Sequence, residues 1–141
     1  MEKDYHGWGS ELTNEITMME AGVPRFVAKD KGSFRDRDAT LEARPRGRAV
    51  HMAIDATDTD ARGAEPVLMN DKVFGVTTSA ADDQRIGQSL AFAYVPSEVA
   101  AHGTQLEVQL LGKPHRATIL AEPPLRSVQN QTARLSARGT T

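Results

Sequence analysis

The most regular pattern in the chain is the alternation of apolar and polar residues over Thr104–Leu111. Three aliphatic residues share one face of an extended segment and glutamine or glutamate occupies the other, which is typical of a half-buried strand. A second extended segment, His115–Ala121, follows after only a few residues. Gly112-Lys113 therefore predicts a type II′ hairpin turn, with Pro114 beside the turn, where its missing N–H costs no ladder bond.

Four further short segments have the composition of strands. Val50–Asp55 is an apolar run between turn-forming residues, and Ser89–Val95 is apolar on both faces, which predicts a strand covered on both sides. Pro66–Met69 and Lys72–Thr78 are separated by Asn70-Asp71. Both turn residues tolerate the positive φ of a type I′ turn, so we expect a second hairpin here.

Two stretches carry helix signals. Ser33 resembles an N-cap, because acidic residues follow it in the first turn, and it predicts a helix over Phe34–Ala43 that Pro45 prevents from continuing. Ser97 is expected to cap a turn or two of helix ending at Gly103.

The remaining segments are predicted to be irregular. Ala56–Ala64 and Ser79–Gln88 are polar and are expected to form loops. Residues 1–33 show no sustained period and predict a partly extended lead-in with a helical turn near Met18–Ala21. About six short strands at hairpin spacing favour a mainly β fold, an antiparallel six-stranded barrel or jelly-roll-like domain with one or two short helices.

Composition narrows the classes of function. The 141 residues carry 17 Lys and Arg against 19 Asp and Glu, a net charge of −2, which gives no reason to expect a nucleic-acid or membrane partner. The absence of cysteine excludes disulfides, thiolate catalysis and sulfur-ligated zinc. No stretch approaches 18 apolar residues and no signal-peptide run opens the chain, so we expect a soluble, cytoplasmic protein.

The metal-ligating residue types do not form a recognisable site. An EF-hand loop starting at Asp58 places Arg62 at its fifth position and Met69 at its twelfth, where a bidentate glutamate is required, so the calcium hypothesis fails. The histidines are scattered without metal-ligand spacing and are expected to have packing or surface roles: His6, His51, His102 and His115.

Five arginines gather within Arg35–Arg48, interleaved with three acidic residues. They predict either a solvated face or a free-standing interaction module that binds an acidic partner or nucleic acid. No aromatic platform is close by, which makes nucleic acid the less favoured partner. No nucleophile elbow, P-loop or dinucleotide fingerprint occurs, and no carboxylate pair is fixed by any pattern, so no catalytic residue is predicted.

The opening MEKDYHGWGSELTNEITMMEAG resembles the signature of the aminomethyltransferase (glycine cleavage T-protein) family, and most resembles the form fused to dimethylglycine and sarcosine dehydrogenases. The resemblance continues in order to about residue 125. The matching residues are Glu2, Lys3, Tyr5, Trp8, Gly9, Glu11, Leu12, Thr17, Glu20, Ala21, Gly22, Asp30-Lys31-Gly32, Phe34, Glu65-Pro66-Val67, Gly75-Val76-Thr77, Ser89-Leu90-Ala91, Ala93-Tyr94-Val95-Pro96, Gly103-Thr104, Leu106-Glu107-Val108 and Pro124-Leu125.

The resemblance implies a division of the chain into three parts. Residues 1–33 correspond to the tail of a folate-binding aminomethyltransferase domain, 34–125 to the C-terminal β-barrel domain and 126–141 to an irregular tail. Enzymes of this kind transfer a one-carbon unit from an amine to tetrahydrofolate, and FAD is expected only in a fused or partner domain. The acidic group that assists the transfer lies in the upstream folate-binding domain or subunit, so this chain is not expected to be catalytic alone.

Tyr5 and Trp8 are the candidate cofactor-binding residues, as a lining of the folate pocket. The alternative is that both aromatic side chains simply pack against the barrel. Thr78–Asp82 stands where relatives carry a Ser-Gly-Gly-like loop, so the backbone there is expected either to follow another path or to be strained.

Overall fold

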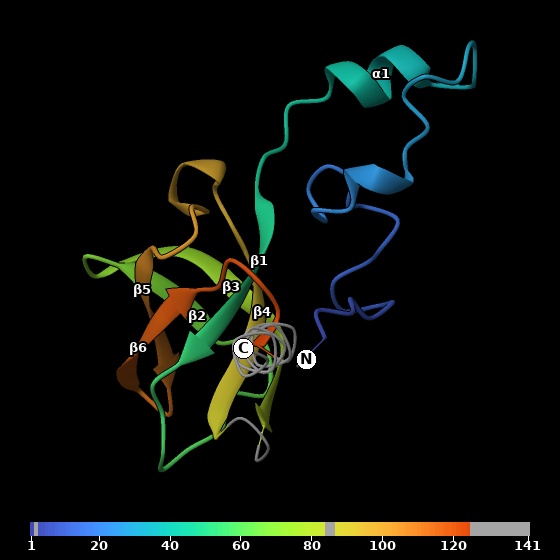
Figure 1. The fold of residues 1–141 in the computed structure, drawn as a ribbon. Helices are drawn as coiled ribbons and strands as arrows, with labels where there is room; N and C mark the ends of the chain where they lie inside the picture. The colour runs from blue at the N-terminus through green and yellow to red at the C-terminus, as the bar shows by residue number, and fades with distance from the viewer. Residues whose placement is uncertain (2, 84–86, 125–141) are drawn as a thin grey trace, which may run out of the picture.

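A closed barrel of six antiparallel strands forms the body of the molecule in this computed structural model, which describes residues 1, 3–83 and 87–124 (Figure 1). The order of the strands around the barrel is β1-β4-β3-β2-β5-β6, and β1 closes onto β6. This architecture confirms the predicted mainly β, six-stranded antiparallel fold. The strands are β1 (Arg48–Ile54), β2 (Pro66–Met69), β3 (Lys72–Asp83), β4 (Gln88–Val95), β5 (Gln105–Leu110) and β6 (Lys113–Ile119).

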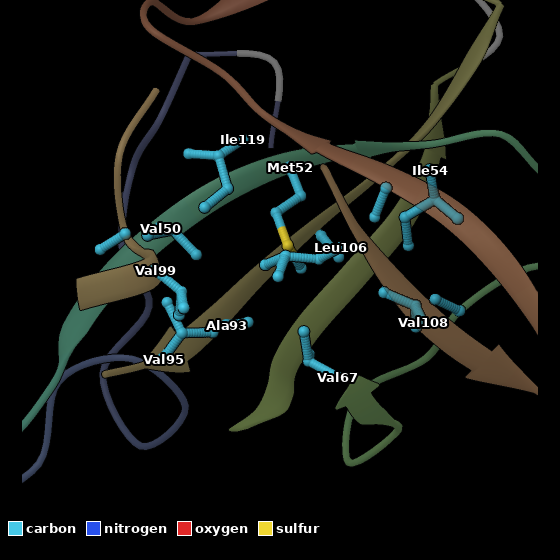
Figure 2. Packing of buried hydrophobic residues seen from close by; sticks show 14 of the residues in the cluster. Val50, Met52, Ile54, Val67, Ala93, Val95, Val99, Leu106, Val108 and Ile119 are labelled. Carbon is cyan, nitrogen blue, oxygen red and sulfur yellow. The ribbon is translucent and has the colours of Figure 1, made fainter. Parts of the chain in front are cut away.

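The interior of the barrel is filled by aliphatic side chains from every second position of its strands (Figure 2). The alternation along β5 is the clearest case, because its aliphatic side chains are buried and its polar side chains are exposed, as predicted. Small residues on β4 leave room for Met52 of β1, which is fully buried. The labelled core residues are Val50, Met52, Ile54, Val67, Ala93, Val95, Val99, Leu106, Val108 and Ile119.

Strand β4 is covered on both faces, which confirms the prediction made from its composition. Ala91, Ala93 and Val95 belong to the interior cluster. Leu90 and Phe92 alternate with them and project from the outer face, yet they are only 0% and 1% exposed. An additional segment must therefore cover the outside of the barrel at this strand.

The two hairpin turns adopt related conformations. Asn70 and Asp71 have φ values of 51° and 60°, which confirms the predicted type I′ turn. In the other hairpin the ladder pairs Leu110 with Lys113, so the two turn residues are Leu111 and Gly112, with φ values of 48° and 80°. The predicted Gly112-Lys113 turn of type II′ is therefore wrong by one position, because two positive φ values belong to type I′.

The predicted polar loop over Ser79–Gln88 is also wrong, because β3 continues to Asp83 and β4 begins at Gln88. A register shift between Thr77 and Ser79 marks a bulge, after which pairing resumes. Backbone pairing with β4 stabilises this polar stretch, which has few of the apolar residues that identify a strand from sequence.

The first helix is shorter than predicted. Helix α1 spans Arg37–Glu42, and its N-cap is Asp36, with no side-chain capping bond, so Ser33 is not the cap. Asp36 has a φ of 57°, in the left-handed region, and helical geometry therefore cannot begin before the next residue. Pro45 follows the end of the helix, as expected.

The predicted second helix is reduced to one 3-10 turn, η2 (Ser97–Val99), whose N-cap is Pro96. Ser97 is thus the first residue of the turn and not its cap. The N–H of Gly103 donates to the carbonyl of Ile119 at 2.8 Å, which ties this residue to β6 and ends any helical continuation.

Two segments precede the barrel. The leader, residues 1–22 without the undescribed residue 2, lies beside the barrel, and the arm, residues 23–46, stands away from it (Figure 1). The arm holds α1 and a 3-10 turn, η1 (Pro24–Phe26), and neither element contains a buried residue. No described helix is long and apolar enough to cross a membrane. The predicted tail at 126–141 lies outside the described residues.

Candidate functional site

The leader is attached to the outside of the barrel by Glu11, whose side chain is buried although it is a carboxylate. The hydroxyls of Thr78 and Ser79 on β3 donate to its Oε1 at 2.6 and 2.5 Å. The N–H of Gly7 and the hydroxyl of Ser10 donate to its Oε2, each at 2.8 Å. One carboxylate oxygen thus binds the barrel while the other binds the leader.

These contacts set the charge of Glu11. Burial alone raises the pKa of Glu11, but the hydrogen bonds from Ser79, Thr78, Gly7 and Ser10 outweigh burial and hold the pKa below its usual value. The carboxylate therefore stays ionised at neutral pH. Its oxygens are occupied by donors, so it is not available to accept a proton from a substrate.

Tyr94 on β4 adds a second connection to the same residue. Its hydroxyl donates to the main-chain carbonyl of Glu11 at 2.8 Å. Burial, followed by the nearby charges of Glu11 and Glu20, raises the pKa of Tyr94 to about 12. The phenol therefore remains a donor over the whole physiological pH range.

The end of the leader is fixed by Glu20. The N–H of Ala49 on β1 donates to the Glu20 carbonyl at 2.7 Å, and the N–H of Arg46 donates to the Glu20 carboxylate at 3.1 Å. The backbone N–H of Thr17 is the main cause of the lowered pKa of Glu20. The leader is thus anchored at its middle, by Glu11, and near its end, by Glu20.

Ahead of these anchors, near its start, the leader covers Phe92. The ring of His6 lies edge-on to Phe92 at 4.9 Å between centroids, and the ring of His51 from β1 lies 4.7 Å from it. Neither ring nitrogen of His51 has a hydrogen-bond partner in the described part of the chain, and Asp4 Oδ1 is 3.7 Å from its Nδ1. Burial lowers the pKa of His51 to about 4, so the ring is neutral.

Tyr5 and Trp8 point away from the barrel, with 77% and 76% of their surface exposed. The hypothesis that these two side chains pack against the barrel is therefore wrong. The inward positions of the leader are taken by His6 and Glu11, and the turn at Gly9, with a φ of 92°, leaves Trp8 on the outside. An exposed tryptophan and tyrosine on an anchored segment form a candidate docking surface.

Comparison with known proteins identifies the fold's family. Residues 47–125 match the family described as the glycine cleavage T-protein C-terminal barrel domain. The chain belongs to this family. The chain is 39% identical over 127 residues to the mitochondrial dimethylglycine dehydrogenase of Rattus norvegicus, and 33% identical over 118 residues to the aminomethyltransferase of Moorella thermoacetica.

The same comparisons confirm the resemblance recognised in the sequence and show that the chain is short. It is matched over 87% of its own length by the rat protein but spans only 15% of that relative, and it spans 32% of the Moorella aminomethyltransferase. The barrel is also similar to glycine cleavage system aminomethyltransferase T from Bartonella henselae, with a TM-score of 0.78 at 23% identity. That match covers 86% of this chain and 36% of the solved chain, and it supports the fold.

The five arginines within Arg35–Arg48 do not converge on one site. Arg35 lies 3.8 Å from Asp36, and Arg37 lies 3.4 Å from Asp38, so both are paired with their sequence neighbours. The remaining arginines of the cluster, Arg44, Arg46 and Arg48, are exposed. This arrangement favours a solvated surface over a built anion site.

The histidines lie at two places: three of them line one cavity, and His115 lies beside the start of the aspartate-rich loop. Within residues 1, 3–83 and 87–124, no three His, Asp or Glu side chains are arranged to hold a metal ion. His115 Nδ1 lies 3.4 Å from the carbonyl of Asp55, and His102 is exposed. His6, His51 and His102 all line a cavity of about 250 Å³, whose other walls come from the leader, β1 and the segment that follows β6.

Sequence reasoning matched Glu11 and Glu65 to the family but assigned neither a role. Glu65 accepts from the N–H groups of Arg62 at 2.7 Å and Gly63 at 2.9 Å, and from the hydroxyl of Thr77. Burial raises the pKa of Glu65, but these bonds outweigh it and the pKa is lowered. The available signal was the hydroxyl run Thr77–Ser79, which supplies donors to both carboxylates, that of the buried Glu11 and that of the half-buried Glu65.

Proposed function

We propose that this chain is the C-terminal barrel of a tetrahydrofolate-dependent aminomethyltransferase or of a dimethylglycine or sarcosine dehydrogenase-like protein. In this role it supports one-carbon transfer from an amine to tetrahydrofolate and is not catalytic alone. Its partner is an upstream folate-binding domain or subunit. FAD, where it takes part, belongs to a fused or partner domain.

The main support for this proposal is that one side of the leader is bound to the barrel while the other side exposes two aromatic side chains. Its inner side is bound to the barrel through Glu11 and Glu20, whereas Tyr5 and Trp8 remain exposed on its outer side. Aromatic side chains of this size contribute strongly to interfaces when they are covered. The chain spans only a minor part of the relatives that it matches, which supports a further domain as the group that covers them.

The division of the chain follows the same logic. We assign residues 1–33 to the tail of the folate-binding domain and 34–125 to the barrel domain. The leader then connects the two, because its hydrogen bonds run to β1, β3 and β4 while its aromatic residues face away. Tyr5 and Trp8 lie where one face of a folate pocket closes.

The titratable groups near the leader support a non-catalytic role. Glu11 is ionised and saturated with donors, and Tyr94 keeps its proton. His51 is neutral, but it is only 7% exposed. A general acid or base must reach its substrate, and none of these three groups is free to do so.

The proposal is tested by titrating tetrahydrofolate into the chain alone and into the chain mixed with a purified folate-binding domain of an aminomethyltransferase. Binding is expected only in the mixture. Trp8→Ala is expected to weaken association of the two chains by about tenfold or more, because a central aromatic anchor is lost. Val73→Ala, which alters an exposed residue on β3, is the matched control and leaves association unchanged. Absence of both folate binding and association overturns the proposal.

A further inference from the structure

We propose that Glu11 is a positioning residue: its carboxylate locks the leader to the barrel and fixes the outward orientation of Tyr5 and Trp8. The lock is a property of this chain alone. Only the identity of what docks on Tyr5 and Trp8 rests on the function proposed above.

The bulge in β3 makes the lock possible. Successive side chains of a regular strand point to opposite faces, so neighbouring hydroxyls do not normally reach one acceptor. At the register shift between Thr77 and Ser79 this alternation is interrupted. Thr78 and Ser79 therefore both donate to the same oxygen, Glu11 Oε1.

The other carboxylate oxygen organises the leader. Glu11 Oε2 accepts from the N–H of Gly7 and the hydroxyl of Ser10. The loop is also closed by its own backbone, since the N–H of Leu12 donates to Gly7 O at 3.0 Å and the N–H of Gly9 to Leu12 O at 2.8 Å. Trp8 sits inside this closed loop, so its orientation follows from the position of Glu11.

No neutral side chain of this size accepts from all four donors at once. A glutamine at position 11 keeps one carbonyl oxygen, while its NH₂ group can only donate, so the hydroxyls of Thr78 and Ser79 that now donate to Glu11 must turn to accept instead. Hydrogen bonds to a charged group are also stronger than those to a neutral one. Glu11→Gln is therefore expected to release the leader while the aliphatic interior of the barrel is untouched.

Trp8 is the only tryptophan in the chain and reports the lock directly. In Glu11→Gln, we expect lower fluorescence anisotropy of Trp8 and cleavage by chymotrypsin at Tyr5 and Trp8 that is faster by on the order of tenfold. Glu15→Gln, on an exposed side chain of the same segment, is the control and changes neither readout.

A second variant changes the barrel side of the same contact, and it serves as the test if Glu11→Gln does not fold. Thr78→Ala with Ser79→Ala removes the donors to Oε1 and is expected to lower Trp8 anisotropy in the same way. Combining it with Glu11→Gln should add little, because both changes remove one interaction. In the native chain the anisotropy should also fall as Glu11 is protonated in acid, and Glu11→Gln should abolish that pH dependence.

Unchanged anisotropy and unchanged cleavage in both folded variants overturn the inference. These measurements need neither tetrahydrofolate nor a second chain. If the native chain neither associates with a folate-binding domain nor binds tetrahydrofolate with it, the proposed function fails while the lock is still judged by Trp8. If the variants behave as the native chain does, the lock fails whatever the partner is.

Discussion

At the scale of single residues, His51 links the stability of the protein to pH. Its pKa is lowered from the usual 6.5 to about 4 because the ring is buried. Between these two values the ring is protonated in the unfolded chain and neutral in the folded chain. The full stability is present above pH 6.5, and about 3 kcal/mol is expected to be lost as the pH falls toward 4. Urea unfolding at a series of pH values measures this loss.

The variant His51→Gln is expected to flatten the profile between pH 6.5 and 4, whereas exposed His102→Gln leaves it unchanged. Glu11 and Glu65 act in a different window. Their lowered pKa values mean that their contributions are present above about pH 4.5 and are lost below it. A native profile that is flat above pH 4.5 contradicts the role given to His51.

At the scale of elements, Gly75 of β3 lies directly against the backbone of β4. A Cβ at this position would lie 2.1 Å from the carbonyl oxygen of Tyr94, so the two strands must separate to accept it. Gly75→Ala is therefore expected to cost about 3 kcal/mol, measured by chemical or thermal unfolding. Gly32→Ala in the arm, where no atom lies within 4 Å of the new Cβ, is the control. Equal stability of the two variants contradicts this packing.

The same elements show what the sequence reveals and what it does not. Alternation identified β5, and the tolerance of Asn70 and Asp71 for positive φ identified their turn, because both signals are local. The extension of β3 to Asp83 was missed because strand β4, and not local composition, stabilises it. The helix begins after Asp36 and not after Ser33, because Asp36 adopts a left-handed conformation. The identity of the residue alone does not predict that conformation.

The candidate site also contains residues that the sequence pointed to and one whose role it did not reveal. Tyr5 and Trp8 were singled out because they belong to the opening segment that resembles the aminomethyltransferase family. Glu11 could not be given its role, since its partner Thr78 lies 67 positions away and the contact depends on a bulge. A buried carboxylate is visible only once the strands that supply its donors are placed.

At the scale of the whole molecule, the leader has one face for stability and one for docking. Its inner face covers Phe92 and His51, which are 1% and 7% exposed. Burial of an aromatic side chain contributes roughly 1.5–3 kcal/mol. Removing residues 1–22 is therefore expected to lower the free energy of unfolding by at least about 2 kcal/mol and to increase the binding of a hydrophobic dye.

The outer face provides the matched comparison. Tyr5→Ser with Trp8→Ser alters two side chains that are already exposed, so we expect the unfolding midpoint of the full chain to stay within about 0.5 kcal/mol of the native value. The same double variant should lose association with a folate-binding domain. If the truncated chain is as stable as the native chain, the leader is not part of the barrel's folding unit. If the double serine variant is strongly destabilised, then Tyr5 and Trp8 contribute to stability and the outer face does not serve docking alone.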